Sequence, residues 1–310
     1  MSRIHDALKR AEQDRSVYKG IGIEEVEVLA IPAIGPIPVT PAADNARSPA
    51  IPPVVPASDP MALDTALAGS PRTTWVPDTQ TMLFFGTEEQ ADGTEQFRTL
   101  RSQLYQLREK HSLRKILVAS SVPSEGRSFV AANLAQVMAR QPGCRALLID
   151  ADLRSPHLHL ALGTSPSPGL SEYLLGETQE FEIIQRGQME NLFFVASGRP
   201  VSGQTEIISN GRLKFLLDRL EPLFDWIIID SPAAIPVSDA GLIANFCDGV
   251  LMVVRSNSTP FDIVRKARQK FNDDRVLGVV LNGISAEIDP KTQHYFSATR
   301  PTSGQKDAPE

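Results

Sequence analysis

A glycine-containing loop, set between a buried-strand pattern and a helical pattern, constrains this chain more than any other feature. The apolar run 116–119 precedes the loop, and a helical pattern runs from Ser128 to Arg140. Successive backbone N–H groups in such a loop bind phosphate, and the N-terminus of the following helix adds its dipole. The strand–loop–helix context separates a phosphate-binding loop from a chance glycine. We therefore expect nucleotide contacts from Ser121, Pro123, Ser124, Glu125, Gly126, Arg127, Ser128 and Phe129.

Carboxylates end two further apolar runs. Asp150 and Asp152 follow the run that starts at Leu147, and Asp230 follows the run that starts at Trp226. Because parallel strands end at one edge of a sheet, these acids should gather beside the phosphate loop. One such acid would favour a helix cap or turn, whereas three acids beside a phosphate loop favour a nucleotide site. Such carboxylates hold Mg²⁺, so ATP and Mg²⁺ are the expected ligands.

The spacing of apolar runs predicts the fold class. Short apolar runs alternate with helical patterns, which is typical of an α/β fold with a mostly parallel sheet and helices on both faces. Strands are expected over 115–120, 145–150, 192–196, 226–230, 250–255 and 276–282. Helices are expected over 89–109, 128–140, 204–220, 238–246 and 261–271.

Composition divides the chain into four parts. Residues 1–18 have the spacing of an amphipathic helix, which either docks on a partner or packs on its own domain. Residues 19–85 form an expected linker, because eleven of the chain's 24 prolines lie there and proline interrupts helices and interior strands. The predicted nucleotide-binding domain covers 86–285, and a polar tail covers 286–310.

Charge and cysteine content exclude some classes of function. A net charge of −6 gives no reason to expect nucleic-acid binding. Cys144 and Cys247 lack metal-ligand spacing and are expected to be buried thiols, and His157 and His159 have no partners that would complete a metal site. Without an apolar run of about 18 residues, no membrane span is predicted. We expect a cytoplasmic protein that reaches the inner face of the membrane through a partner.

Several motifs together resemble one known family over residues 93–282. They are Glu95-Gln96-Phe97-Arg98-Thr99-Leu100-Arg101, the stretch from Asp150 to Pro156, Gly169-Leu170-Ser171, Asp230-Ser231-Pro232 with Ser238-Asp239-Ala240, and Gly278-Val279-Val280-Leu281-Asn282. In this order they are similar to the bacterial tyrosine kinases (BY-kinases) of capsule and exopolysaccharide assembly. That family belongs to the P-loop branch of the cell-division and plasmid-partition ATPases.

The resemblance implies roles for individual residues. Glu95, Arg98 and Arg101 would support ring-like self-association, and Asn282 would contact the purine. The implied magnesium ligands are Ser128, Asp150 and Asp230. The implied catalytic residues are Arg127, Asp150 and Asp152, of which Asp152 would orient or deprotonate a tyrosine hydroxyl. The implied partner is a membrane polysaccharide co-polymerase, also called a chain-length regulator.

The chain departs from the family pattern at the loop and in the tail. Arg127 stands where the family has lysine and Ser124 where it has glycine, and an arginine does not reproduce the compact charge of a lysine at a phosphate. The family's C-terminal tyrosine cluster is reduced to Tyr295, a possible phosphate acceptor or an ordinary surface residue. Three functions stay open: an autokinase, a pseudokinase that binds nucleotide as a regulator, and a partition-type ATPase.

Overall fold

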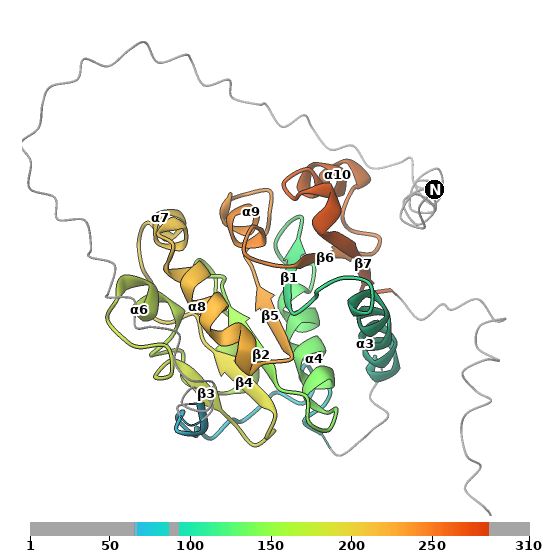
Figure 1. The fold of residues 1–310 in the computed structure, drawn as a ribbon. Coiled ribbons are helices and arrows are strands. Elements are labelled where there is room, and N and C mark those ends of the chain that lie inside the picture. The colour runs from blue at the N-terminus through green and yellow to red at the C-terminus, as the bar shows by residue number, and fades with distance from the viewer. Residues whose placement is uncertain (1–64, 66, 87–92, 285–310) are drawn as a thin grey trace, which may run out of the picture. The chain divides into compact units, whose positions relative to one another are not determined.

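A seven-stranded sheet forms the centre of the larger of two compact units, which begins at Ser70 (Figure 1). The computed structural model describes residues 65, 67–86 and 93–284. The predicted helix over 1–18 and the tail over 286–310 lie outside the described residues.

The strands confirm a mostly parallel sheet. They are β1 (Lys115–Ser120), β2 (Ala146–Asp150), β3 (Ile184–Arg186), β4 (Leu192–Val195), β5 (Trp226–Asp230), β6 (Gly249–Arg255) and β7 (Val276–Asn282). Their order across the sheet is β3-β4-β2-β5-β1-β6-β7, and only β3 is antiparallel to its neighbour. The sequence did not predict β3, whose three residues are too short for a visible pattern. In the register of β2 and β5, Asp150 lies opposite Asp230.

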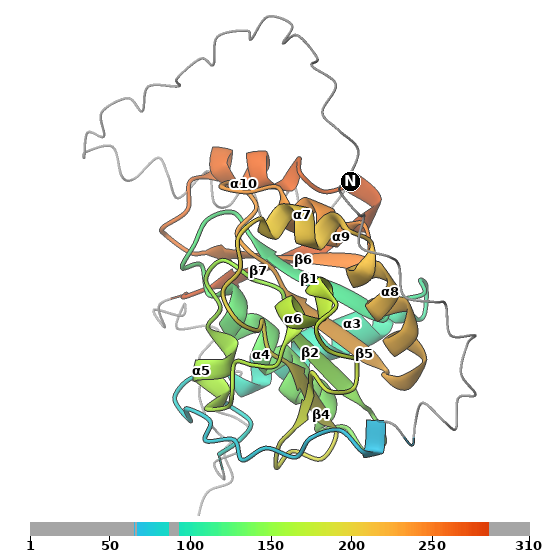
Figure 2. The same ribbon diagram turned by 90° about the vertical axis from the view of Figure 1, so that its left-hand side faces the viewer.

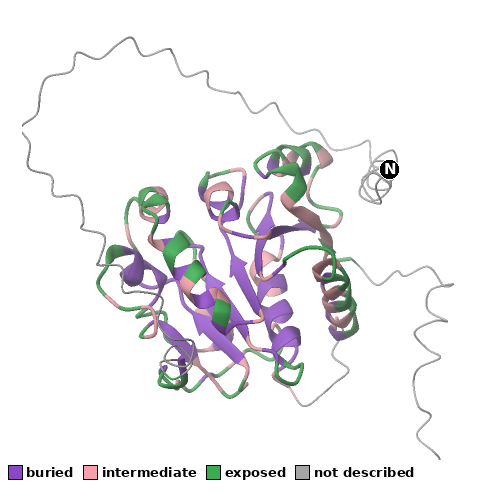
Figure 3. Cartoon of the chain, viewed as in Figure 1, coloured by how far each residue is buried: buried purple, intermediate pink, exposed green. Residues whose placement is uncertain are grey.

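Helices cover both faces of the sheet. They are α3 (Thr94–Arg108), α4 (Arg127–Ala139), α5 (Leu158–Leu162), α6 (Leu170–Leu175), α7 (Gln204–Ser209), α8 (Arg212–Leu220), α9 (Asp239–Ala244) and α10 (Phe261–Arg268). Figures 1 and 2 show α4 and α8 on opposite sides of the sheet. Side chains of successive strand residues point to opposite faces, so strands covered on both sides are apolar throughout. β1 and β5 are accordingly buried at every position, as Figure 3 shows for the centre of the sheet.

The predicted helix over 204–220 is wrong as a single element. It consists of α7 and α8, separated at Asn210 and Gly211. Gly211 has φ of 84°, a left-handed conformation that ends a helix and that glycine adopts without a steric cost. Two further short helices, α5 and α6, lie between β2 and β3, where the sequence pattern predicts no helix.

Residues 70–86, here called the strap, pack with the sheet and helices, so the predicted linker boundary at 85 is wrong. Trp75, Met82 and Phe84 are buried in the same core as α4. The strap's backbone pairs with the edge strand β3 and with α5, where the N–H of Thr73 donates to Arg186 and that of Val76 to Gly163. The apolar residues of the strap therefore belong to the packed unit. Residues 19–64 of the predicted linker lie outside the described residues.

Candidate functional site

The loop between β1 and α4 has the backbone shape of a phosphate cradle. Ser124 has φ of 66° and Gly126 has φ of 89°, so two residues of the loop are left-handed. A Cβ atom at Gly126 would lie 1.8 Å from the Asn282 side-chain nitrogen, so only glycine fits there. A chain that alternates between left- and right-handed residues turns successive N–H groups toward one side, and this forms an anion-binding concavity.

Glu125 holds the loop together from within. Its carboxylate is buried and accepts hydrogen bonds from the N–H groups of Ser121 and Val122 at 2.6 and 2.9 Å, and from the Thr259 hydroxyl at 2.6 Å. The N–H of Ser121, a predicted phosphate donor, is thus already used. Within the described residues, no acceptor binds the N–H groups of residues 124–129. These groups, at the positive end of α4, are the ones left for a phosphate.

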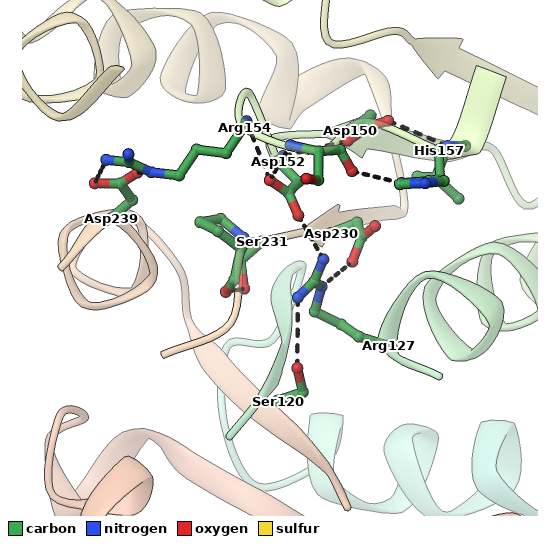
Figure 4. Close-up of polar contacts among 12 residues, drawn as sticks. Ser120, Arg127, Asp150, Asp152, Arg154, His157, Asp230, Ser231 and Asp239 are labelled. Carbon is green, nitrogen blue, oxygen red and sulfur yellow. Dashed lines mark hydrogen bonds and ion pairs between the residues drawn. The ribbon is translucent and has the colours of Figure 1, made fainter. Parts of the chain in front are cut away.

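Arg127 turns toward the acids at the ends of the neighbouring strands (Figure 4). Its Nε donates to Asp230 Oδ1 at 2.7 Å, and its Nη2 donates to Asp152 Oδ2 at 2.7 Å. A longer bond of 3.4 Å joins Nη1 to the Ser120 hydroxyl. All three guanidinium nitrogens therefore have partners. Arg127 and Asp230 thus lie close together where the loop meets the edge of the sheet, as the sequence predicts. The arginine's charge, however, is directed at two carboxylates.

The environment changes the pKa values of this group of side chains. Burial raises the pKa of Asp230, although Arg127 and a hydrogen bond from Ser128 oppose that effect. The pKa of Asp150 is raised well above its ordinary value, first by burial and then by the charges of Asp230 and Asp152. For Arg127 the nearby carboxylates outweigh the cost of burial, and the guanidinium pKa is raised. The arginine is therefore a permanent cation of the site.

Asp150 and Asp152 also hold the chain that follows β2. Asp150 accepts hydrogen bonds from the N–H groups of Asp152 and Leu158, and Asp152 accepts from those of Arg154 and Ser155. Both predicted catalytic acids thus lie at the predicted edge of the sheet, with their oxygens already paired. Among the described residues, no group of three or more His, Cys, Asp or Glu side chains is arranged to hold a metal ion.

Asn282 lies at the end of β7, beside the loop. Its Nδ2 donates to the Glu125 carbonyl at 2.9 Å, and its Oδ1 accepts from the N–H of Gly283 at 2.9 Å. The structure thus brings Asn282 to the nucleotide loop, as expected. Its contact with a purine stays a prediction.

A cavity of about 500 Å³ opens over the loop. Three segments line it: the loop itself, the chain after β2 and the chain after β5. Arg154 lies in this lining and binds Asp239 through Nε at 2.7 Å, while the Thr205 hydroxyl donates to the same carboxylate at 2.6 Å. In the sequence, Arg154 and Asp239 stand out only as positions of two separate motifs, with no sign that they pair. Their pairing spans 85 residues, and no local pattern signals it.

The residues predicted for self-association lie on α3. Glu95 and Arg98 pair with each other at the surface, whereas Arg101 donates to the Val137 carbonyl at 3.0 Å and so ties α3 to α4. Self-association of this face stays a prediction. Tyr295 lies outside the described residues. No described helix is long and apolar enough to cross a membrane.

Known proteins resemble this chain in sequence and in fold. No protein-family model matches it. Tyrosine-protein kinase YwqD of Bacillus subtilis (strain 168) is 30% identical over 222 residues, which are 71% of this chain and 92% of that protein. The chain belongs to the bacterial tyrosine-protein kinase family. The kinase domain of Escherichia coli tyrosine kinase ETK matches with a TM-score of 0.60 and 28% identity, over 63% of this chain and 77% of that domain.

Some relatives are much longer proteins. Succinoglycan biosynthesis transport protein ExoP of Rhizobium meliloti (strain 1021) is 33% identical over 193 residues, which are 61% of this chain but only 24% of ExoP. The chain thus spans about a quarter of that relative. The resemblance predicted from the motifs is confirmed, and so is the P-loop fold of these kinases.

Proposed function

We propose that this chain is a nucleotide-binding regulator derived from BY-kinases, with weak or no transfer of phosphate to tyrosine. The observation that carries the proposal is the placement of Arg127 between Asp152 and Asp230. To turn the donors that now bind the two acids toward a γ-phosphate, the guanidinium must leave at least one buried carboxylate unpaired. Breaking a buried ion pair costs roughly 3–5 kcal/mol, which is large against the gain from one phosphate contact.

Asp152 is also poorly prepared to act as a base. Its Oδ1 accepts two backbone N–H groups, at 3.2 and 3.0 Å, and its Oδ2 accepts Arg127. A general base needs an oxygen within reach of the proton that it removes. The loop amides keep their binding capacity, so the site favours nucleotide binding over phosphoryl transfer.

The biological setting is part of the same proposal. The name of one relative refers to succinoglycan biosynthesis and transport, and this supports a role in exopolysaccharide or capsule polymerisation and export. A membrane polysaccharide co-polymerase would then be the partner that recruits this chain to the inner face of the membrane. Self-association through Glu95, Arg98 and Arg101 would respond to the bound nucleotide.

Nucleotide binding at the loop is tested with Gly126→Ala. The added Cβ would clash with Asn282, so affinity for a fluorescent ATP analogue should fall by about tenfold or more. Gly143→Ala is the matched control: Gly143 also has a positive φ, of 73°, but its Cβ would meet no atom within 4 Å. Circular dichroism checks that both variants fold. Equal affinities in the two variants, or no binding by the wild type, would contradict the proposal.

Phosphoryl transfer is tested with radiolabelled γ-phosphate on wild type, Arg127→Lys and Tyr295→Phe. We expect little label on the wild type. Lysine should raise transfer by about one to two orders of magnitude if geometry at this residue limits the rate, because misplacement of about 1 Å costs on the order of a hundredfold. If Ser124 and Phe129 have co-adapted, lysine alone changes little. Strong wild-type label that disappears in Tyr295→Phe would instead identify an active single-site kinase.

A further inference from the structure

The two predicted carboxylate ligands of magnesium, Asp150 and Asp230, are already engaged by the protein itself. Asp230 is almost fully buried, with a side chain 1% exposed, and it binds Arg127 through Oδ1. A divalent cation at Ser128 and Asp230 would have to displace a guanidinium that is itself positively charged. The residues present therefore do not fit the predicted Mg²⁺ site.

The arrangement depends on the shape of arginine. Two different guanidinium nitrogens bind two different carboxylates at 2.7 Å, and the Arg127 side chain is 11% exposed. A guanidinium presents several donors in one plane, whereas the lysine ammonium is a compact point charge on one nitrogen. Charge-assisted hydrogen bonds of this length are among the stronger ones in proteins. Arginine thus joins Asp152 and Asp230 in a way that lysine at the same position would not.

Positive charge toward a phosphate is available without a metal. The cavity wall contains Arg154, together with the loop whose N–H groups at residues 124–129 have no acceptor among the described residues. Arg154 is only partly buried, with a side chain 36% exposed. These groups line the same cavity.

We infer that Arg127 replaces the divalent cation at this site, so that the chain binds the phosphates of a nucleotide without requiring Mg²⁺. The inference rests on the proposed nucleotide binding and adds how that binding is regulated. Nucleotide binding would not depend on the cellular concentration of Mg²⁺. The arginine would also stay paired with the two acids when the nucleotide leaves.

Two titrations test the inference. Binding of a fluorescent ATP analogue is measured in millimolar Mg²⁺ and in EDTA, and Mn²⁺ alone is titrated by electron paramagnetic resonance. For the wild type we expect affinities within about threefold in the two buffers, a difference well below the about 1.4 kcal/mol of a tenfold change. We also expect no bound Mn²⁺. For Arg127→Lys, which frees one carboxylate, we expect Mg²⁺ to strengthen binding by about tenfold or more and Mn²⁺ to bind.

Arg154→Lys is the matched control, because it makes the same exchange in the same cavity but at a residue paired with Asp239. It should lower affinity equally with and without Mg²⁺. Wild-type binding that needs Mg²⁺ by tenfold or more, or Mn²⁺ bound equally by wild type and Arg127→Lys, would overturn this inference alone. Absence of nucleotide binding in both buffers would overturn the proposed function as well.

Discussion

At its first residue, α4 holds the ends of β5 and β2 through the charge of Arg127, whereas from Asn133 onward the same helix holds the strap through side-chain amides. Asn133 Oδ1 accepts from the N–H of Leu83 at 2.9 Å, and Gln136 Oε1 accepts from that of Phe84 at 3.1 Å. Both amide side chains are completely buried. One region pairs charges in a cavity, and the other pairs neutral groups in a core.

Ligand binding and stability should therefore depend on different parts of α4. Buried charges carry a desolvation cost that their pairing only partly offsets, so the charged end is expensive to maintain and suits a ligand site. A buried neutral hydrogen bond contributes about 0.5–1.5 kcal/mol, and leaving its partner unsatisfied costs more. We therefore expect substitutions along the strap to affect unfolding most, and those at the loop to affect ligands most.

The largest effect on stability is expected for Trp75→Ala. Trp75 is 4% exposed and meets Phe85 and Phe194 edge-to-face at 6.2 Å between ring centroids. Removing a buried aromatic side chain costs about 3–5 kcal/mol of unfolding free energy. Urea denaturation followed by circular dichroism measures it. Val76→Ala is the control, since Val76 is 72% exposed and should change stability by less than about 0.5 kcal/mol. Similar losses in the two variants would show that the strap does not stabilise the unit.

A somewhat smaller loss is expected for Asn133→Leu. The amide of Asn133 also donates to the Thr81 carbonyl at 2.8 Å and to the Phe129 carbonyl at 2.9 Å, and leucine keeps the volume but none of these bonds. With the N–H of Leu83 left buried and unsatisfied, the unfolding free energy should fall by about 2–4 kcal/mol.

Gln141→Leu, at an exposed position just after α4, is the control for this substitution. It should leave the urea midpoint nearly unchanged. If Asn133→Leu unfolds at the same urea concentration as the wild type, the strap is held by its aromatic residues alone.

Sequence reasoning identified the charged end of α4 and missed the strap, for physical reasons. Arg127, Asp150 and Asp230 follow apolar strands, and the strand pattern places them at one edge of the sheet. The partners of Asn133 and Gln136 are backbone N–H groups, which every residue except proline has, so no residue type marks them. The prolines near the strap pointed to a linker, whereas the apolar residues between them enter the core.

The site itself was predictable in position but not in pairing. The loop and the acids lie where the motifs predict, because a parallel sheet brings strand ends together whatever the side chains do. The direction of Arg127 depends on its reach across to two other strands, and the bond from Arg154 to Asp239 depends on where α9 begins. Such contacts follow from tertiary packing, which a local pattern does not contain.

The smallest effect is expected for Asp150→Asn, which should change the pH dependence of stability. The pKa of Asp150 is raised, mainly by burial, so the folded chain holds this proton more tightly than the unfolded chain does. The contribution of Asp150 to stability is therefore greatest below its ordinary pKa and is lost as the pH rises through its folded value. Asparagine carries no titrating proton, so the variant should lose less stability than the wild type as the pH rises above the ordinary pKa of an aspartate. The amount by which the variant's unfolding free energy lies below that of the wild type should then shrink as the pH rises. Urea denaturation at several pH values measures this, with Gln141→Leu expected to run parallel to the wild type. Parallel curves for Asp150→Asn and wild type would mean that Asp150 holds no buried proton.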